Sequence, residues 1–357
     1  MFKDLQFVKN RANFVRFSFI EEMEKHLLAF ETTAVSNGFK IQWINDEDTF
    51  AEALRGFFTN KQYNRVCFDL KNIPEVFENE KQLIKNVKVE DFESGAEIAE
   101  TLVVDADFGI VENGSVVLAN KRGKNFFNNV NNLIIVLDLN KLLVKQSDLD
   151  LMLFLKYFKD DAPFFPTNVE VITHPYKKVY VDSIAFENED PFKKEEVNTT
   201  IFLYDNGISS ILEDNFLRES LYCIDCGRCK KVCPVFAQVG KFSPIELIKH
   251  NSFEENLRDQ NIFQNTTLCG NCNFICPVNI PLTDILISEM EIVNNRYSRE
   301  KNIDNMKIFA KRGRLNKINN KIRRYFYIRK YYGKNKKLIS YYSSLKGPFF
   351  NLTQTEK

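Results

Sequence analysis

The 357-residue chain lacks several features that define large classes of protein. It has no apolar run near the roughly 18 residues that a transmembrane helix needs, so no spanning segment is predicted. Its opening stretch, MFKDLQFVKNRANFVRF, interrupts its hydrophobic residues with charged ones and does not resemble a secretory signal. The net charge is only +1, which gives no global argument for a nucleic-acid or membrane partner.

Motifs for common cofactors and catalytic groups are also missing. No GxGxxG follows a predicted strand and no GxxxxGK[ST] is present, so neither NAD nor flavin binding has motif support. There is no HExxH and no nucleophile elbow. Histidine is scarce, and His26 and His250 are predicted to be surface residues. His174 follows a predicted strand, where α/β proteins build sites, and is a catalytic candidate.

Cysteine is unevenly distributed rather than scarce. Cys67 stands alone in the first 222 residues, inside VCFDL, and is predicted to be a small buried core residue. The other seven cysteines fall between positions 223 and 276, at spacings of two and three residues. Such spacing is too tight for most of them to bridge one another, as a secreted disulfide protein requires. The pattern therefore indicates metal binding.

The seven cysteines form two related motifs. The first, CxxCxxCxxxCP, ends at Pro234 and has the spacing of bacterial ferredoxins, in which the fourth cysteine ligates the other cluster. The second, CxxCxxxCP, ends at Pro277 and has Thr266 at the position of the leading cysteine. Crossed ligation assigns a first 4Fe-4S cluster to Cys223, Cys226, Cys229 and Cys276. A second cluster takes Cys233, Cys269 and Cys272.

The second cluster is one thiolate short. Thr266 or water could complete a 4Fe-4S cluster, or the site could hold a 3Fe-4S cluster that lacks that iron. A pair of zinc sites is the alternative, but zinc usually takes tetrahedral sets from separated pairs, which fits the triple spacing poorly. Two neighbouring clusters predict an electron relay. Gly227 and Gly270 are expected to let the backbone pass close to the clusters.

The rest of the chain predicts two further regions. Residues 1–212 alternate helices and strands, which predicts an α/β domain with a largely parallel sheet. Asn113-Gly114, between alternating residues, predicts a tight hairpin. The main predicted elements are helices at 20–35, from the cap at Asp46 to Phe58 and at 147–158, and strands at 41–44, 66–70, 87–89, 133–137, 169–172 and 200–204.

The cysteine motifs fall in a mostly helical module, residues 213–296. A basic C-terminal tail, residues 297–357, follows it. Residues 296–346 hold 17 Lys and Arg against two acidic residues, so the nearly neutral total conceals a basic tail and an acidic body. Apolar residues recur at helical spacing in the tail. This pattern fits packing on its own protein and docking to a partner about equally well, and membrane-surface or nucleic-acid binding less well.

These residues resemble the lactate utilisation protein B family. The resemblance is strongest in CIDCGRCKKVCPVF and TLCGNCNFICPVNIPL, and continues in DFGIVENGSVVL and TTIFLYDNGISSIL. It implies a LUD domain, an α/β fold like that of sugar isomerases and CoA transferases, followed by a ferredoxin-like module. It also implies a subunit of a cytoplasmic complex that oxidises L-lactate to pyruvate, together with cysteine-rich dehydrogenase-like and LUD-type partner proteins.

Two segments depart from the family pattern. Thr173-His174-Pro175-Tyr176 replaces the family's Thr-Gly-Pro-Ser loop, and Glu112-Asn113-Gly114-Ser115 replaces its acidic-Thr-Gly-Thr turn. Glu112 and His174 are therefore the catalytic candidates, although Glu112 is better explained as flanking the hairpin turn. Two other functions remain open: electron transfer for another dehydrogenase or acceptor, and redox sensing by a ligand-binding protein.

Overall fold

The computed structural model describes residues 5–59, 65–70, 88–91, 100–120, 130–157, 168–180, 192–205, 207–215, 217–240, 242–253 and 266–297. Internal contacts divide the chain into two units, one of which spans Phe14–Ile208 and is called the α/β unit here. The other, the cysteine module, combines the described residues up to Asn13 with those from Ser209 onward. The predicted basic tail lies outside the described residues, apart from Tyr297 at its start.

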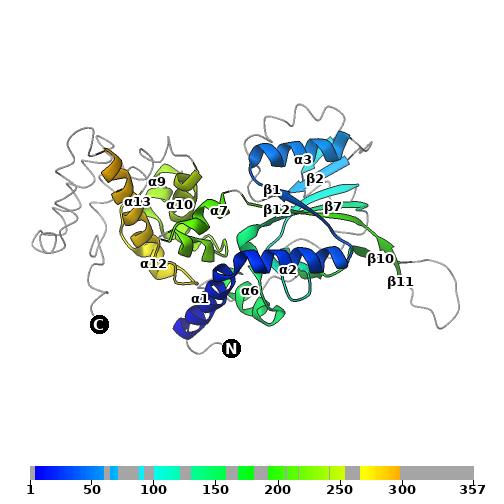
Figure 1. Cartoon of the computed structure of the whole chain (residues 1–357), viewed down its shortest axis with the longest axis horizontal. Helices are drawn as coiled ribbons and strands as arrows, with labels where there is room; N and C mark the ends of the chain where they lie inside the picture. The colour runs from blue at the N-terminus through cyan, green and yellow to red at the C-terminus, as the bar shows by residue number, and fades with distance from the viewer. Residues whose placement is uncertain are drawn as a thin grey trace, which may run out of the picture. The chain divides into compact units, whose positions relative to one another are not determined.

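A six-stranded parallel sheet forms the centre of the α/β unit (Figure 1). Its strands are rich in β-branched and aromatic residues, which favour a pleated, buried backbone. In the central strand β7, the five residues between the two ends are apolar, and six of the seven residues are buried. The strand order is β1 (Lys40–Ile44), β12 (Asn198–Tyr204), β7 (Asn132–Asp138), β4 (Thr101–Asp105), β2 (Arg65–Asp69) and β3 (Lys88–Asp91). This topology confirms the predicted α/β class.

Helices cover both faces of this sheet. Figure 1 shows α3 (Glu47–Thr59) on one side and α2 (Met23–Ser36) with α6 (Leu149–Tyr157) on the other. Asp46 starts α3 as predicted, because its Oδ1 accepts a hydrogen bond of 2.8 Å from the backbone N–H of Thr49. Phe50 and Leu54 on α3 pack with Phe202 in the apolar core between helix and sheet. Cys67 is fully buried in β2, as predicted.

A second, smaller sheet contains the predicted hairpin. Its order is β8 (Leu142–Leu143), β5 (Phe108–Ile110), β6 (Ser115–Asn120) and β9 (Asn168–Ile172). Gly114 turns the hairpin at φ +63°, and a Cβ there would lie 2.6 Å from the backbone nitrogen of Ala34, so a larger residue is excluded. The predicted strand at 169–172 is β9, which runs antiparallel to β6 and so lies outside the parallel sheet. A separate hairpin joins β10 (Tyr176–Tyr180) and β11 (Phe192–Glu196).

The N-terminal region differs from its prediction. A helix not expected from the sequence, α1 (Leu5–Glu21), precedes α2. Glu22 separates the two helices and lies inside the span 20–35, which was predicted to be one helix. Arg16 of α1 is fully buried because its guanidinium donates to the carbonyls of Asn140 and Leu142. His26 is not a surface residue: its side chain is 13% exposed and its ring stacks on Phe19, and burial lowers its pKa.

Helices of five to sixteen residues make up most of the cysteine module. They are α7 (Ile208–Glu213), α8 (Arg228–Val232), α9 (Pro234–Val239), α10 (Pro244–Phe253), α12 (Asn271–Ile275) and α13 (Leu282–Tyr297), with a 3-10 turn at Arg218–Tyr222. His250 lies in α10, but its side chain is outside the described residues. In the part of the chain that the structure describes, no helix is both long and apolar enough to cross a membrane.

Candidate metal centre

The two cysteine motifs build the same backbone twice. In each, a glycine in the left-handed conformation follows a cysteine and starts a five-residue helix: Gly227 before α8 and Gly270 before α12. The residues two positions before these glycines, Asp225 and Leu268, also have positive φ, 53° and 51°. The left-handed conformation costs conformational energy for a residue with a side chain, such as Asp225 or Leu268. The shared conformation indicates that each loop is shaped to direct its cysteines inward.

Both motifs end in the same way. Cys233 and Cys276 close α8 and α12 in an extended conformation, and each is followed by proline. Their sulfurs then accept backbone hydrogen bonds of 3.4 Å, from Phe236 N–H to Cys233 and from Ile280 N–H to Cys276. Amide N–H groups that point at sulfur stabilise negative charge on it, as they do around iron–sulfur clusters.

The fold brings cysteines of the two motifs near one another. Cys276, from the second motif, lies close enough to Cys226 and Cys229 for their charges to interact. Cys223 interacts with the same two cysteines of its own motif. These four residues are the set predicted for the first cluster.

Cysteines of the second predicted set also lie within electrostatic range of one another. Cys233, from the first motif, interacts electrostatically with Cys269 and Cys272 of the second. Helices α8 and α12 pack against each other, and the two sets meet where Cys229 interacts with Cys272. Cysteines of both predicted sets therefore lie within electrostatic range of one another, and the assignment of each to one cluster stays a prediction.

Burial of these thiols bears on whether they fit a metal cluster. Desolvation raises the pKa of Cys223, Cys226, Cys233 and Cys276 above its ordinary value, and raises the pKa of Cys229 to about 12. Metal ligation takes the thiolate form, so a bound metal would have to supply the positive charge that offsets this desolvation. A donor set of sulfur alone, grouped and shielded from water, fits thiophilic iron–sulfur clusters.

The predicted zinc alternative requires ligands that converge on one ion. In an iron–sulfur cluster each iron takes its own thiolate, so the sulfurs surround the cluster without meeting at a point.

Thr266, predicted at the open position of the second cluster, is buried at 7% exposure. Its hydroxyl oxygen accepts a hydrogen bond of 3.2 Å from the backbone N–H of Leu268, inside its own loop. The structure therefore places Thr266 next to the second motif without testing whether it ligates iron. Ligation by Thr266 stays a prediction.

Sequence reasoning missed the side chains around Cys272. The hydroxyl of Thr283, in the first turn of α13, lies 3.7 Å from the Cys272 sulfur. Asn273 Oδ1 accepts hydrogen bonds from both the backbone N–H and the hydroxyl of Thr283, at 2.7 and 2.9 Å. Thr283 is eleven residues from Cys272 and belongs to no cysteine motif, so spacing alone gave no signal for it.

Sequence reasoning also missed the contribution of the N-terminal helix. Asn13 of α1 donates a hydrogen bond of 2.8 Å to the carbonyl of Val278, two residues after Cys276. Asn279, which has a positive φ of 53°, donates to Asn10 Oδ1 at 2.9 Å. These contacts hold the loop after Cys276 across 265 and 269 residues of sequence.

The two catalytic candidates lie in the α/β unit. Glu112 is exposed in the hairpin turn, where its Oε2 accepts a hydrogen bond of 2.9 Å from the backbone N–H of Gln146. This contact explains Glu112 as part of the turn. His174 is exposed on its loop, and its ring stacks on Tyr176 with centroids 6.1 Å apart. Their catalytic roles stay untested.

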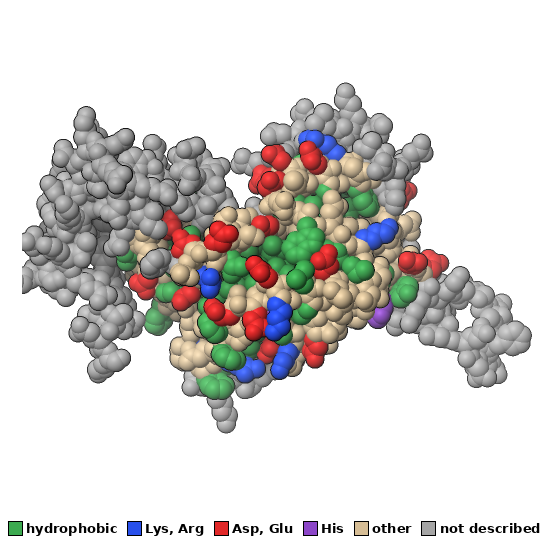
Figure 2. Space-filling view, in the orientation of Figure 1, with side chains coloured by type: hydrophobic (Ala, Val, Ile, Leu, Met, Phe, Trp, Pro, Cys, Tyr) green, Lys and Arg blue, Asp and Glu red, His purple; other side chains and the backbone are tan. Residues whose placement is uncertain are grey.

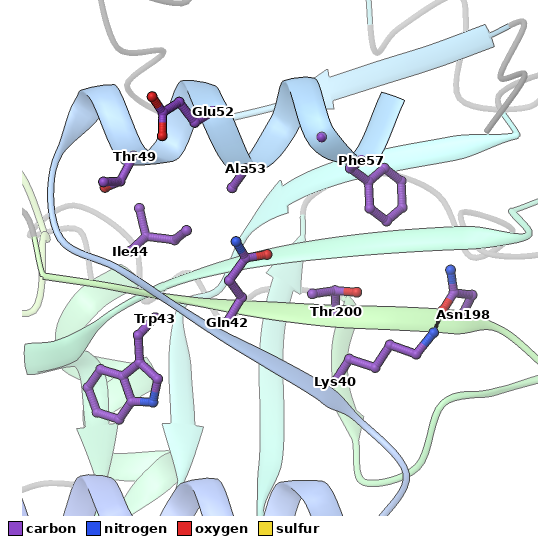
Figure 3. A pocket seen from close by; sticks show the side chains of 11 residues that line it. Lys40, Gln42, Trp43, Ile44, Thr49, Glu52, Ala53, Phe57, Asn198 and Thr200 are labelled. Atoms are coloured by element: carbon purple, nitrogen blue, oxygen red, sulfur yellow. Dashed lines mark hydrogen bonds between the residues drawn. The ribbon is translucent and has the colours of Figure 1, made fainter. Parts of the chain in front are cut away.

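A groove of about 600 Å³ opens in the α/β unit between α3 and the strands β1 and β12 (Figure 3). Ile44 is a buried residue of its lining, and Lys40 Nζ donates a hydrogen bond of 2.7 Å to Asn198 Oδ1 at one end. Neither Glu112 nor His174 lines it. On the face drawn in Figure 2, acidic and basic side chains are interspersed over the described surface.

These features define a class of protein: an α/β unit joined to a dicluster iron–sulfur electron-transfer domain. Residues 219–280 match a family described as a 4Fe-4S dicluster domain, which confirms the prediction of two iron–sulfur clusters. The individual ligand assignments, and the identity of the second cluster as 4Fe-4S or 3Fe-4S, stay predictions.

Part of the chain is similar to proteins of one named kind. The chain is 32% identical over 126 residues to lactate utilization protein B of Bacillus cereus, and 32% over 120 residues to that of Bacillus cytotoxicus. Each match covers 30% of this chain, and the chain spans only a quarter of the length of these curated relatives. The predicted resemblance is thus confirmed for part of the chain. A DUF162 family protein from Deinococcus radiodurans aligns over 51% of this chain and 98% of its own, at TM-score 0.34 and 10% identity.

Proposed function

We propose that this protein is the iron–sulfur electron-transfer subunit of a complex that oxidises L-lactate to pyruvate. The two cysteine motifs, whose seven thiols are buried or half-buried and interact between the motifs, carry the electron-transfer part of the proposal. The partial similarity to proteins named lactate utilization protein B supports the lactate part.

In this proposal the cysteines divide into two ligand sets with different completeness. Cys223, Cys226, Cys229 and Cys276 hold the first cluster with four thiolates. Cys233, Cys269 and Cys272 hold the second with three, and its fourth position is open to Thr266 or solvent. When bound, each cluster supplies one-electron redox chemistry. The chain's own residues supply thiolates, shield them from water and point amide N–H groups at their sulfurs.

Oxidation of lactate to pyruvate releases two electrons and two protons. The sequence offers this chain no nicotinamide or flavin motif to receive a hydride, so the proposal assigns the bond-breaking step to a dehydrogenase-like partner subunit. This chain would accept the electrons one at a time and pass them onward. A LUD-type protein is the other proposed partner. A cytoplasmic location is part of the proposal, since a reducing compartment keeps the cysteines available as thiolates.

The test has two stages with separate outcomes. Anaerobically purified protein is analysed for iron, sulfide and zinc, and its reduced form by EPR; a zinc-only protein would contradict the electron-transfer role. The gene is then deleted, and growth on L-lactate is compared with growth on pyruvate. We expect a defect on lactate alone, restored by the wild-type gene and not by Cys226→Ser. Intact clusters with normal growth on lactate would remove the lactate assignment and leave electron transfer for another donor.

A further inference from the structure

The two cysteine sets receive different hydrogen bonds at equivalent positions. Cys229 and Cys272 each stand three residues after the cysteine that precedes a glycine, and each faces the first turn of a following helix. Cys229 is contacted there by a backbone N–H, that of Ile245 at the start of α10. Cys272 is contacted by a side chain, the hydroxyl of Thr283 at the start of α13.

The Thr283 hydroxyl lies near two possible acceptors, the Cys272 sulfur and Asn273 Oδ1, but it has one proton to donate. The hydroxyl donates to Asn273 Oδ1 at 2.9 Å, and its oxygen lies 3.7 Å from the Cys272 sulfur. Ligation to iron removes the thiol proton and leaves a negatively charged sulfur as the better acceptor. Asn273 Oδ1 loses little when the hydroxyl turns away, because it keeps the backbone N–H of Thr283 at 2.7 Å.

We propose that Thr283 is a positioning residue for the second cluster, which donates a hydrogen bond to the Cys272 thiolate and raises the reduction potential of that cluster. Reduction adds one electron to the cluster and makes or breaks no bond in the protein. A donor to a ligating sulfur stabilises the more negative, reduced form, so its presence shifts the potential upward. The inference rests on the proposed electron-transfer function, and it predicts a difference between two otherwise similar clusters.

The inference is tested by redox titration of the purified full-length protein with dithionite, followed by EPR. Thr283→Val removes the hydroxyl and keeps the branched shape, and Thr283→Ser keeps the hydroxyl. We expect valine to lower the midpoint potential of the second cluster, serine to leave it near the wild-type value, and the first cluster to be unchanged in both. If valine prevents loading of the second cluster, Thr283→Ala serves in its place, since alanine is well tolerated near a helix start.

Equal midpoint potentials of the second cluster in wild type and in the loaded valine or alanine variant would overturn the inference. A parallel shift of both clusters would also overturn it, because a general loosening of the module is then the cause. These outcomes differ from failure of the proposed function, in which the wild-type protein itself shows no reducible clusters. A downward shift confined to the second cluster and reversed by serine supports the role of Thr283.

Discussion

The α/β unit and the cysteine module are stabilised by different means. In the α/β unit, helices of 13 and 14 residues, α3 and α2, cover a parallel sheet whose core residues, such as Phe202, are fully buried. In the cysteine module, α8 and α12 are only five residues long, and non-glycine residues adopt positive φ beside the ligands. Helices that short are marginal by themselves. Apolar burial therefore holds the α/β unit, whereas the cysteine module combines a smaller apolar core with short ligand-bearing segments that we expect metal ligation to stabilise.

Replacing a predicted ligand of the first cluster should have the largest effect on the cysteine module. We expect Cys226→Ser to lose at least one cluster and to unfold the cysteine module, because metal binding and folding are coupled in such sites. Iron and sulfide content measure the first effect, and hydrogen exchange resolved along the chain measures the second. The α/β unit should keep its protection.

Cys67→Ala is the matched control for this experiment. Cys67 is the cysteine of the α/β core, fully buried in β2 and distant in sequence from both motifs. The variant should bind iron like the wild type. Full iron content in Cys226→Ser, or equal loss in Cys67→Ala, would contradict the division of roles.

A core substitution tests the other half of the comparison. Phe202 lies in β12 and packs edge-on against Phe50, with ring centroids 5.9 Å apart. Phe202→Ala should lower the free energy of unfolding of the α/β unit by about 3–5 kcal/mol, the usual cost of removing a buried aromatic ring. Phe202→Leu should cost less because it refills part of the cavity.

The chain offers separate probes for the two units. Its single tryptophan, Trp43, lies in β1 and pairs with Leu203 of the neighbouring strand, so fluorescence during urea unfolding reports on the α/β unit. Cluster absorbance reports on the cysteine module. The prediction fails if Phe202→Ala leaves the fluorescence transition in place, or if it removes the clusters under conditions where the sheet is folded.

The open position of the second cluster allows a test by addition. Thr266→Cys completes the second motif at ferredoxin spacing, and we expect it to raise iron content or to stabilise the second cluster against loss in air. Thr267→Cys, one residue further and also buried, is the matched control with the wrong spacing. Identical iron content and EPR spectra for wild type and Thr266→Cys would place the fourth ligand elsewhere.

The same contrast explains what could be predicted from sequence. Local chemistry was sufficient for the hairpin at Asn113-Gly114, the cap at Asp46 and the cysteine motifs, because each depends on residues a few positions apart. The strand at Thr101–Asp105 was missed, although it is buried between β2 and β7. A short apolar run without flanking turn residues gives little periodicity to detect.

Contacts between distant residues were beyond the reach of sequence patterns. Asn13 holds the loop of Cys276 from 265 residues away, and Arg16 is buried only because distant carbonyls accept its hydrogen bonds. An arginine or asparagine on a helix normally indicates a solvated face. The structural roles of Asn13 and Arg16 could be identified only from the tertiary structure, which places backbone carbonyl acceptors beside them.

The smallest predicted effect concerns the start of α3 and has a defined pH dependence. Hydrogen bonds from the backbone N–H and the hydroxyl of Thr49 lower the pKa of Asp46 below its ordinary value. A carboxyl group with a lower pKa in the folded state stabilises the fold fully above its unfolded pKa, near 3.9, and loses that contribution as the pH falls through the folded value. Asp46→Asn keeps a capping side chain without the charge, whereas Asp46→Ala removes the cap.

At neutral pH, Asp46→Ala should therefore lower the thermal midpoint of the α/β unit more than Asp46→Asn does, as followed by Trp43 fluorescence. Below about pH 4 the difference between wild type and Asp46→Asn should shrink, because the wild-type carboxyl becomes protonated. Cluster absorbance should be the same in all three proteins, since the cap belongs to the α/β unit. A pH-independent difference would contradict the role of the Asp46 charge, and a change in cluster content would contradict the assignment of the cap to the stability of the α/β unit alone.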